Sequence, residues 1–417
     1  MNKLTYYYFF VIFSILPISI VIGSSISLIN VVIIDLSFLI LLIHIKNFSF
    51  IKTKAFKLLL ILYVYLIFNS FISINPELGI LRNLGFIRVI ILFVAFNYFF
   101  NIKFFFKKVF FIWSIFLTFI VLDVFLESFS GQNLFGYGEM YGKRIVSFFR
   151  DEPIVGWYIN SFYFLIIGYL FDYFLKENKY KIFLLLTVFL VAIILTGERA
   201  SSIKAILSIA VFFLLFKEIN LKKKILFLSS FFILLSIILI NTEHLKYRYL
   251  NQTFFVKLDG QPSDQSFLSN LNDTLYVRHY KSGIEVFKKN KVLGVGNKNY
   301  RLETCKNKNE MDLNQKKNYL CSTHPHQIYF ELLSEHGLFG TILILIIFYN
   351  LIFSRVLKGF DKETYLHKGS FAYLLLIFFP LIPSGAFFSD YPLTVLAINL
   401  SIFYGSSKKL NIFKNNK

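Results

Sequence analysis

Cysteine is scarce: the 417-residue chain has two, so at most one disulfide can form within it. Both, Cys305 and Cys321, fall in the one long hydrophilic stretch of the sequence. If that stretch lies in an oxidising compartment, a disulfide between them would contribute about 3 kcal/mol, because it restricts the unfolded chain. Two unpaired thiols are the alternative, and the sequence does not decide between them.

Acidic residues are also few: 24 Asp and Glu stand against 44 Lys and Arg, which gives a formal net charge of +20. In a soluble protein this excess would suggest a nucleic-acid partner. The chain is, however, 56% hydrophobic, with 54 Phe and 25 Tyr, and this exceeds what a soluble core of that length needs. We therefore expect a membrane protein in contact with lipids that binds no nucleic acid.

Metal-binding motifs are missing from the hydrophilic segments. There is no outward Asp-x-Asp and no His/Cys cluster with the spacing of metal ligands, and Asp151-Glu152 is the nearest approach. We expect neither a metal nor a cofactor. The two halves of the chain also lack the related broken helices of many transporters. Met1–Ser24 has no small-residue cleavage site, so we interpret it as a retained first span.

Long apolar runs dominate what is present. About twelve are long enough to cross a bilayer, which predicts an all-α polytopic membrane protein with both termini on one side. The runs lie at about 5–24, 27–45, 55–74, 79–100, 107–127, 154–175, 181–197, 201–216, 224–241, 333–354, 369–388 and 391–406.

Lys and Arg are unevenly shared between the loops that join these runs. One alternate set, which includes both termini, holds about 23 of them, and the short loops of the other set hold about four. The positive-inside rule therefore predicts cytoplasmic termini. The loops at 128–153, 197–200 and 242–325 are then outward, and the last is the one large outward loop. Its basic excess suits an anionic ligand.

A polar, histidine-bearing stretch precedes one of the most apolar runs. Pro325 suits a first helical turn, so we expect a helix from about His326, whose imidazole the helix dipole would keep neutral. A neutral imidazole can act as a general base. His326, Phe330 and Gly337 would then share one face, and Gly340 with Gly337 would let a neighbouring helix approach. The alternative for His326 is a hydrogen-bonded surface group.

This stretch resembles the signature of the bacterial O-antigen ligase and O-antigen polymerase superfamily. That signature is a histidine followed by Asn, Ser or Gln, then nine residues and Gly-x-x-Gly. His326-Gln327, nine residues, Gly337 and Gly340 match it. The resemblance implies that His326 is the catalytic base.

Two arginines extend the resemblance. Arg199 stands in a tight outward turn, where the family has an arginine followed by small residues, although Glu198 replaces the small or hydroxyl residue expected before it. Arg278 precedes Gly294 by the spacing described for outward loops of O-antigen polymerases. The resemblance implies that both arginines bind a lipid-linked pyrophosphate, which guanidinium forks suit. A salt bridge to Glu198, or snorkelling, is the alternative for Arg199.

The residues around Arg278 also predict an amphipathic helix. An Asn272/Asp273 cap would start it, apolar residues recur at helical spacing, and Gly294 and Gly296 would close it.

Weaker candidates have only supporting roles. His324, Gln327 and Glu335 lie near the histidine and could orient it. Arg82 and Arg88 lie inside the fourth run and either face the site or pair with Asp123. These are predictions from position alone.

The resemblance implies a helical membrane glycosyltransferase of the type C class in the bacterial inner membrane. Its donor would be an undecaprenyl-diphosphate-linked glycan held in a periplasmic cavity, and its acceptor a lipid A core or a second lipid-linked glycan. Transfer would be inverting and metal-independent. The implied domains are N-terminal helices 1–180, a shared domain 181–354 containing loop 242–325, and C-terminal helices with a tail 355–417. A transporter or flippase without catalysis is the alternative.

Overall fold

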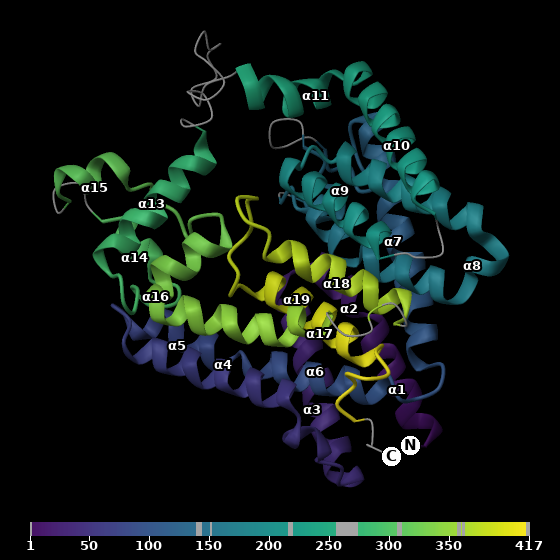
Figure 1. The fold of residues 1–417 in the computed structure, drawn as a ribbon, viewed down its shortest axis with the longest axis horizontal. Coiled ribbons are helices and arrows are strands. Elements are labelled where there is room, and N and C mark those ends of the chain that lie inside the picture. Colours follow the sequence, from purple (N-terminus) through teal and green to yellow (C-terminus); the bar gives the residue numbers. More distant parts are fainter. Residues whose placement is uncertain are drawn as a thin grey trace.

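The protein is helical throughout the parts that its computed structural model describes. These are residues 2–138, 144–150, 152–215, 220–255, 274–306, 311–356, 360 and 363–413. Within them the only β-type pairing is an isolated bridge between Gln132 and Gly138. The all-α prediction is confirmed, and both termini lie at the same end of the helical body (Figure 1).

Seven helical segments are long and apolar enough to cross a membrane. This confirms a multi-span membrane protein, whereas the number twelve stays a prediction. The helices that make up these segments are α1 (Lys3–Ser14) with α2 (Leu16–Ile22), α3 (Ser24–Ile45), α4 (Lys54–Phe71), α5 (Pro76–Leu84) with α6 (Ile87–Phe99), α7 (Phe105–Ser130), α10 (Leu221–Asn241) and α16 (Ile328–Phe348), which continues into η5 (Tyr349–Phe353).

Helix α8 (Val155–Leu195) is a special case, because it doubles back on itself. The Tyr163 hydroxyl donates to the Leu186 carbonyl at 2.9 Å, whereas a straight helix would separate these residues by about 35 Å. The Phe171 and Phe183 rings also meet, with centroids 5.6 Å apart. The two predicted runs at 154–175 and 181–197 are therefore antiparallel limbs, and α9 (Arg199–Leu214) follows them.

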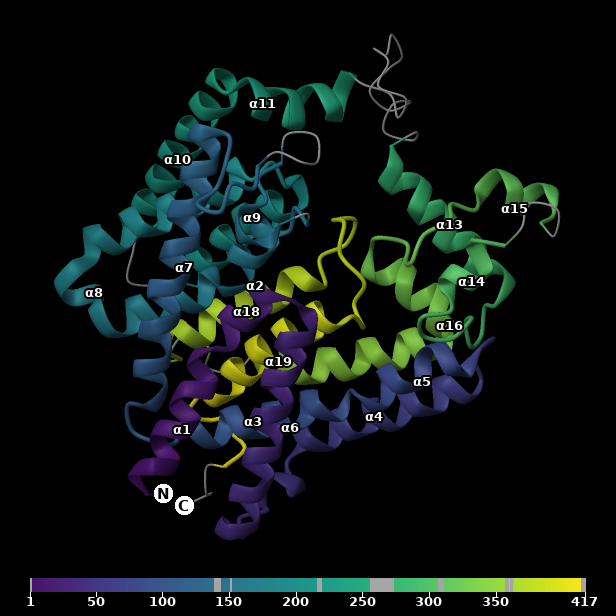
Figure 2. The same cartoon turned by 180° about the vertical axis from the view of Figure 1, so that it is seen from behind.

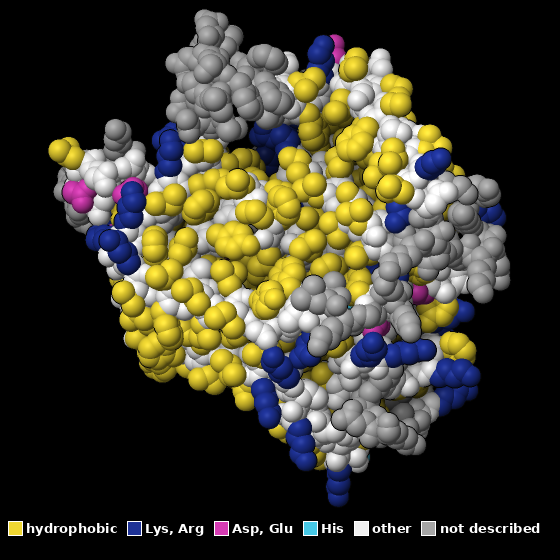
Figure 3. Space-filling model, viewed as in Figure 1, with side chains coloured by type: hydrophobic (Ala, Val, Ile, Leu, Met, Phe, Trp, Pro, Cys, Tyr) yellow, Lys and Arg dark blue, Asp and Glu magenta, His cyan; other side chains and the backbone are white. Residues whose placement is uncertain are grey.

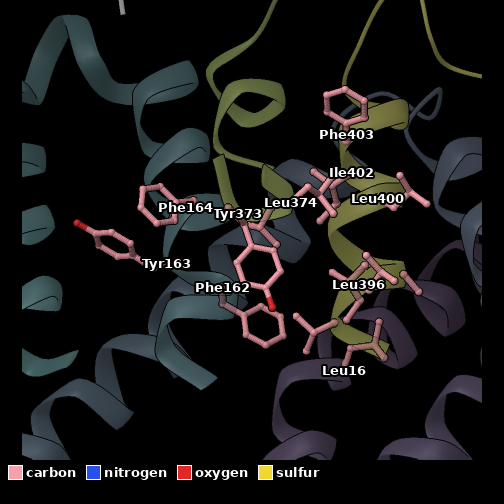
Figure 4. Close-up of a cluster of buried hydrophobic side chains, with 14 of the residues drawn as sticks. Leu16, Phe162, Tyr163, Phe164, Tyr373, Leu374, Leu396, Leu400, Ile402 and Phe403 are labelled. Atoms are coloured by element: carbon pink, nitrogen blue, oxygen red, sulfur yellow. The ribbon is translucent and has the colours of Figure 1, made fainter. Parts of the chain in front are cut away.

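Helices α18 (Tyr365–Ile377) and α19 (Asp390–Gly405) form the centre of the bundle. Their side chains pack against α8 and α2, with Phe162, Tyr373 and Leu396 among the buried contacts (Figure 4). The predicted run 369–388 is only partly helical, since α18 ends at Ile377 and residues 378–389 continue without a helix. Non-helical backbone at this depth is tolerated where it is buried in protein or lines a cavity.

An apolar band covers the visible face of the molecule, and Lys and Arg gather beyond it at the end where both termini lie (Figure 3). A second group of basic side chains lies at the opposite rim, near α13 (Leu275–Lys289). This separation of an apolar belt from charged ends is what a bilayer-embedded protein requires.

The hydrophilic region carries short helices, α11 (Glu243–Lys246), η3 (Tyr247–Phe255), α13, α14 (Tyr300–Thr304) and α15 (Leu313–Asn318). Helix α13 confirms the predicted amphipathic helix, but Thr274 caps it, not Asn272 or Asp273, which lie with the rest of 256–273 outside the described residues. Residues 307–310 are also outside them. A disulfide joins Cys305 to Cys321.

The hydrophilic region is joined to α16 at a break in that helix. Gly337 has a φ of +61°, so the helix stops and restarts there. Before the break, the Ser334 and Glu335 carbonyls accept from the N–H groups of Val295 and Gly296. After it, the N–H groups of Leu338 and Phe339 donate to the Lys291 and Val292 carbonyls. Residues 291–296 thus satisfy the backbone groups that the break exposes.

Gly294 and the two signature glycines, Gly337 and Gly340, allow this close approach. A Cβ on Gly294 would lie 2.5 Å from the Gly337 nitrogen, and one on Gly337 would lie 2.6 Å from the Gly294 nitrogen. A Cβ on Gly340 would lie 2.6 Å from Cζ of Tyr65 on α4, which runs beside α16 in both views (Figure 1 and Figure 2). The predicted close helix contact is confirmed at Gly340, whereas at Gly337 the neighbour is residues 291–296.

We expect Gly294→Ala to destabilise the protein by more than about 3 kcal/mol, since it combines a positive φ of +72° with a backbone clash. Gly131 is the matched control. Its φ is +79°, but a methyl group added there would have no other atom within 4 Å, so Gly131→Ala should cost only about 1 kcal/mol. Thermal unfolding in detergent measures both, and equal losses would contradict the packing described.

Candidate active site

A cavity of about 440 Å³ opens between the hydrophilic region and the membrane helices. One wall carries charged and polar side chains from residues 144–154, the start of α8 and the start of α9, including Arg144, Glu198 and Lys204. The apolar wall is the part of the lining that comes mainly from α16, α18 and α19, including Leu376 and Leu396. His324 and His326 also line the cavity.

His326 lies outside the helix, so the prediction that α16 begins at His326 is wrong. Gln327 is the N-cap, and its side-chain oxygen accepts from the N–H groups of Tyr329 and Phe330 at 2.8 and 3.2 Å. His326 has a φ of +54° and therefore shares no helical face with Phe330. The Ser384 N–H donates to the His326 carbonyl at 2.8 Å and holds this conformation.

Three histidines meet at this point. The His326 ring lies 4.1 Å from the His324 ring and 4.4 Å from the ring of His279 on α13, centroid to centroid. Burial, followed by the proximity of the other rings and of nearby cations, lowers the pKa of His324 to about 3 and that of His279 to about 4. Burial also lowers the pKa of His326. The expected direction is therefore found, but burial, not the helix dipole, is the main cause.

Arg199 is the first residue of α9. It lies close enough to Tyr276 and Arg144, both of which line the cavity, to interact with them electrostatically. Arg248 is buried, donates to the Gly197 carbonyl at 3.3 Å, and lies close enough to Arg144 and Arg199 for their charges to interact. Burial, then these two charges, lowers the pKa of Arg248 to about 10. Three guanidinium groups therefore lie near one another, of which Arg144 lines the cavity, whereas Arg199 and Arg248 are not among its lining residues.

Sequence reasoning missed Arg144 and Arg248. Arg144 lies in a loop that was not expected to carry chemistry, and Arg248 lies in η3, a short segment with no motif of its own. The one available signal was that Arg248 lies only a few residues after the predicted run 224–241, close to its outward end.

Glu198, the departure from the family pattern, caps a helix. Its carboxylate accepts from the N–H groups of Gly156 and Trp157 at 2.6 and 2.9 Å, and from the Ser201 hydroxyl at 2.8 Å. Burial raises the pKa of Glu198 to about 7, against the opposing effect of these hydrogen bonds. Glu198 thereby fixes the first turn of α8 to the arginine-bearing turn.

Arg278 is placed differently from Arg199. It is exposed on α13 and does not line the cavity, although Tyr276 does. Two residues along a helix turn the side chain by about 200°, so Tyr276 and Arg278 face opposite ways. A contact between Arg278 and a ligand stays a prediction.

Arg82 and Arg88 neither line the cavity nor pair with Asp123, so both expectations for them were wrong. Each binds a different oxygen of Asp390, at 2.5 Å. Asp123 instead accepts from the Leu134 N–H at 3.0 Å and from the Ser147 hydroxyl. The two arginines therefore anchor the first residue of α19.

The remaining candidates make hydrogen bonds to the segments around the site. Glu335 is buried and accepts from the Tyr300 N–H at 3.4 Å. Glu331, one turn earlier, accepts from the Phe387 N–H through both oxygens at 3.0 Å, which fixes the loop that holds His326. Nδ1 of His324 lies 3.0 Å from the Thr323 hydroxyl.

Comparison with known proteins gives one family. Residues 182–345 match the sequence model of the family described as O-antigen ligase, and this region contains Arg199, Arg248 and His326. No curated protein sequence matches the chain. Residues 182–345 thus form a domain similar to O-antigen ligases, and this match supports the resemblance of the chain to the O-antigen ligase and polymerase superfamily.

Proposed function

We propose that the protein is a membrane glycosyltransferase that transfers or polymerises an undecaprenyl-diphosphate-linked glycan in O-antigen or surface polysaccharide assembly. The observation that carries this proposal is the cavity itself. Its lining combines the imidazole of His326, whose pKa is lowered, the guanidinium of Arg144, which interacts with the charges of Arg199 and Arg248, and apolar side chains suited to a lipid.

In the proposed reaction, His326 removes the proton from an acceptor hydroxyl while that oxygen attacks the anomeric carbon of the donor with inversion. The glycosidic C–O bond to the pyrophosphate breaks, and the lipid diphosphate leaves with the electron pair. Arg199, with Arg144 and Arg248, stabilises the charge that develops on this leaving group. Because these cations supply the electrostatic stabilisation, we propose that transfer needs no metal.

The apolar wall suits the first isoprene units of the donor. Ile328, Leu376, Ile377 and Leu396 line it, at the side where the cavity meets the membrane helices. We further propose twelve spans, cytoplasmic termini and a periplasmic cavity. The Cys305–Cys321 disulfide in the hydrophilic region supports an oxidising compartment on that side.

His326→Ala should lower the rate of transfer by about 10²- to 10⁴-fold, the usual contribution of a general base. The measurement uses purified protein, a lipid-linked glycan donor and a lipid-linked or lipid A core acceptor. His44→Ala, an exposed histidine on α3 outside the cavity, is the control and should retain full activity. If the His326→Ala variant transfers glycan at the wild-type rate, His326 is not the general base.

Arg144→Gln should lower the rate of transfer about tenfold or more and raise the KM for the donor by a similar factor, because a charge-assisted contact with the phosphate is lost. Arg150→Gln is the matched control, since Arg150 lies on the same loop but lines a different pocket. Equal effects of the two substitutions would show that only the overall charge of the loop matters.

Activity should fall at low pH as His326 becomes protonated. Because burial lowers the pKa of His326 below its ordinary value of 6.5, the neutral base persists into mildly acidic solution, and the acid limb of kcat/KM should have its midpoint below pH 6.5. An acid limb with its midpoint above pH 6.5, unchanged by substitution of any histidine in the cavity, would contradict this assignment.

The acceptor separates the two activities of the family. In cells that lack the protein, loss of surface polysaccharide from lipid A would indicate a ligase, and shortened chains would indicate a polymerase.

A further inference from the structure

One part of the cavity has no role in the reaction proposed above. Trp157, in the first turn of α8, and Tyr391, at the start of α19, both line the cavity, and their ring centroids lie 6.4 Å apart at an interplanar angle of 50°. Asn160 follows Trp157 by three residues, so it lies on the same helical face, and it also lines the cavity. Two aromatic rings and an amide therefore share one region.

Polar atoms in this region lack protein partners. Among the described residues, Oδ1 of Asn160, Nε2 of His324 and Oγ of Ser384 are buried and make no hydrogen bond. The Asn160 side chain belongs to a residue that is only 3% exposed. A buried polar atom without a partner costs about 1–3 kcal/mol, so these three atoms fit a ligand that brings hydrogen-bonding groups of its own.

A carbohydrate ring has the matching chemistry. Its hydroxyl groups can donate to an amide oxygen and an imidazole nitrogen and can exchange hydrogen bonds with a serine hydroxyl. Its C–H faces are weakly positive and can lie on the negative faces of aromatic rings. An isoprenoid chain would leave the three polar atoms unpaired, and a phosphate would favour the guanidinium groups.

We propose that Trp157, Tyr391 and Asn160 form a sugar-binding subsite, and that it holds the reacting ring of the acceptor glycan. This inference rests on the proposed glycosyl transfer. The acceptor is favoured over the donor because two of the unpaired atoms belong to the surroundings of His326. The His324 ring touches the His326 ring, and Ser384 holds the His326 backbone. A sugar bound to them presents a hydroxyl to the base.

Both aromatic residues are held in advance of binding. The backbone N–H of Trp157 donates to Glu198 at 2.9 Å, which fixes its turn of α8. Tyr391 follows Asp390, which Arg82 and Arg88 hold from two sides. A preformed platform lowers the entropic cost of ordering the sugar.

Tryptophan fluorescence tests the subsite, because the chain has only two tryptophans. Trp113 is 1% exposed and its indole N–H donates to the Phe13 carbonyl in the helical core, so a ligand-induced change should come from Trp157. The full-length protein in detergent is titrated with a lipid-free oligosaccharide of the host's own polysaccharide repeat, and separately with farnesyl diphosphate.

We expect a saturable change with the oligosaccharide, no such change in Trp157→Phe, and about tenfold weaker binding in Asn160→Ala. Asn399→Ala is the matched control, because Asn399 also has an unpaired, buried Oδ1 but does not line the cavity. The proposal is overturned if the oligosaccharide causes no change, if only farnesyl diphosphate causes one, or if Trp157→Phe keeps the response.

Kinetics separate this inference from the proposed function. Tyr391→Ala and Asn160→Ala should raise the KM for the acceptor about tenfold while the KM for the donor stays constant. If the wild-type protein transfers glycan but both KM values are unchanged in the variants, the subsite is wrong and the activity stands. If the wild-type protein transfers nothing with any acceptor, the proposed function itself fails.

Discussion

The structure depends on the four backbone hydrogen bonds between residues 291–296 and the break in α16 at Gly337. They join the hydrophilic region to a helix that enters the bilayer, and they satisfy the carbonyl and N–H groups that the break would otherwise leave unpaired in an apolar setting. Because α13 precedes this connection and His326 precedes α16, the same contact brings His279 against His326.

Acidic side chains hold other elements of the bundle together. Glu198 caps α8, Asp172 accepts from the Tyr365 and Leu366 N–H groups at the start of α18, and Glu331 accepts from the Phe387 N–H in the loop beside His326. Each carboxylate accepts from backbone N–H groups at a helix start or in a loop, which have no partner within a helix. Glu198 and Glu331 thus hold elements that line the cavity, whereas Asp172 holds the start of α18, a part of that helix that does not line it.

The helical class, the α13 helix and the close helix contact at Gly340 could be predicted from the sequence, since hydrophobic runs, amphipathic spacing and small residues are local signals. The position of His326 before its helix could not be predicted, because Gln327 competes with Pro325 as the starting signal and the Ser384 N–H that binds the His326 carbonyl comes from a distant segment. Asp390 as the partner of Arg82 and Arg88, and Arg248 beside Arg199, depend on contacts between distant segments that carry no spacing pattern.

The central claim is that the uncharged imidazole of His326 and the guanidinium groups of Arg144, Arg199 and Arg248 act on the same bound donor molecule. An experimental structure of the purified protein with a lipid-linked glycan donor tests this most directly. We predict the diphosphate against Arg144, Arg199 and Arg248, the isoprenoid along the wall of α16, α18 and α19, and the anomeric carbon facing His326. A donor bound elsewhere, with His326 far from its anomeric carbon, would contradict the account.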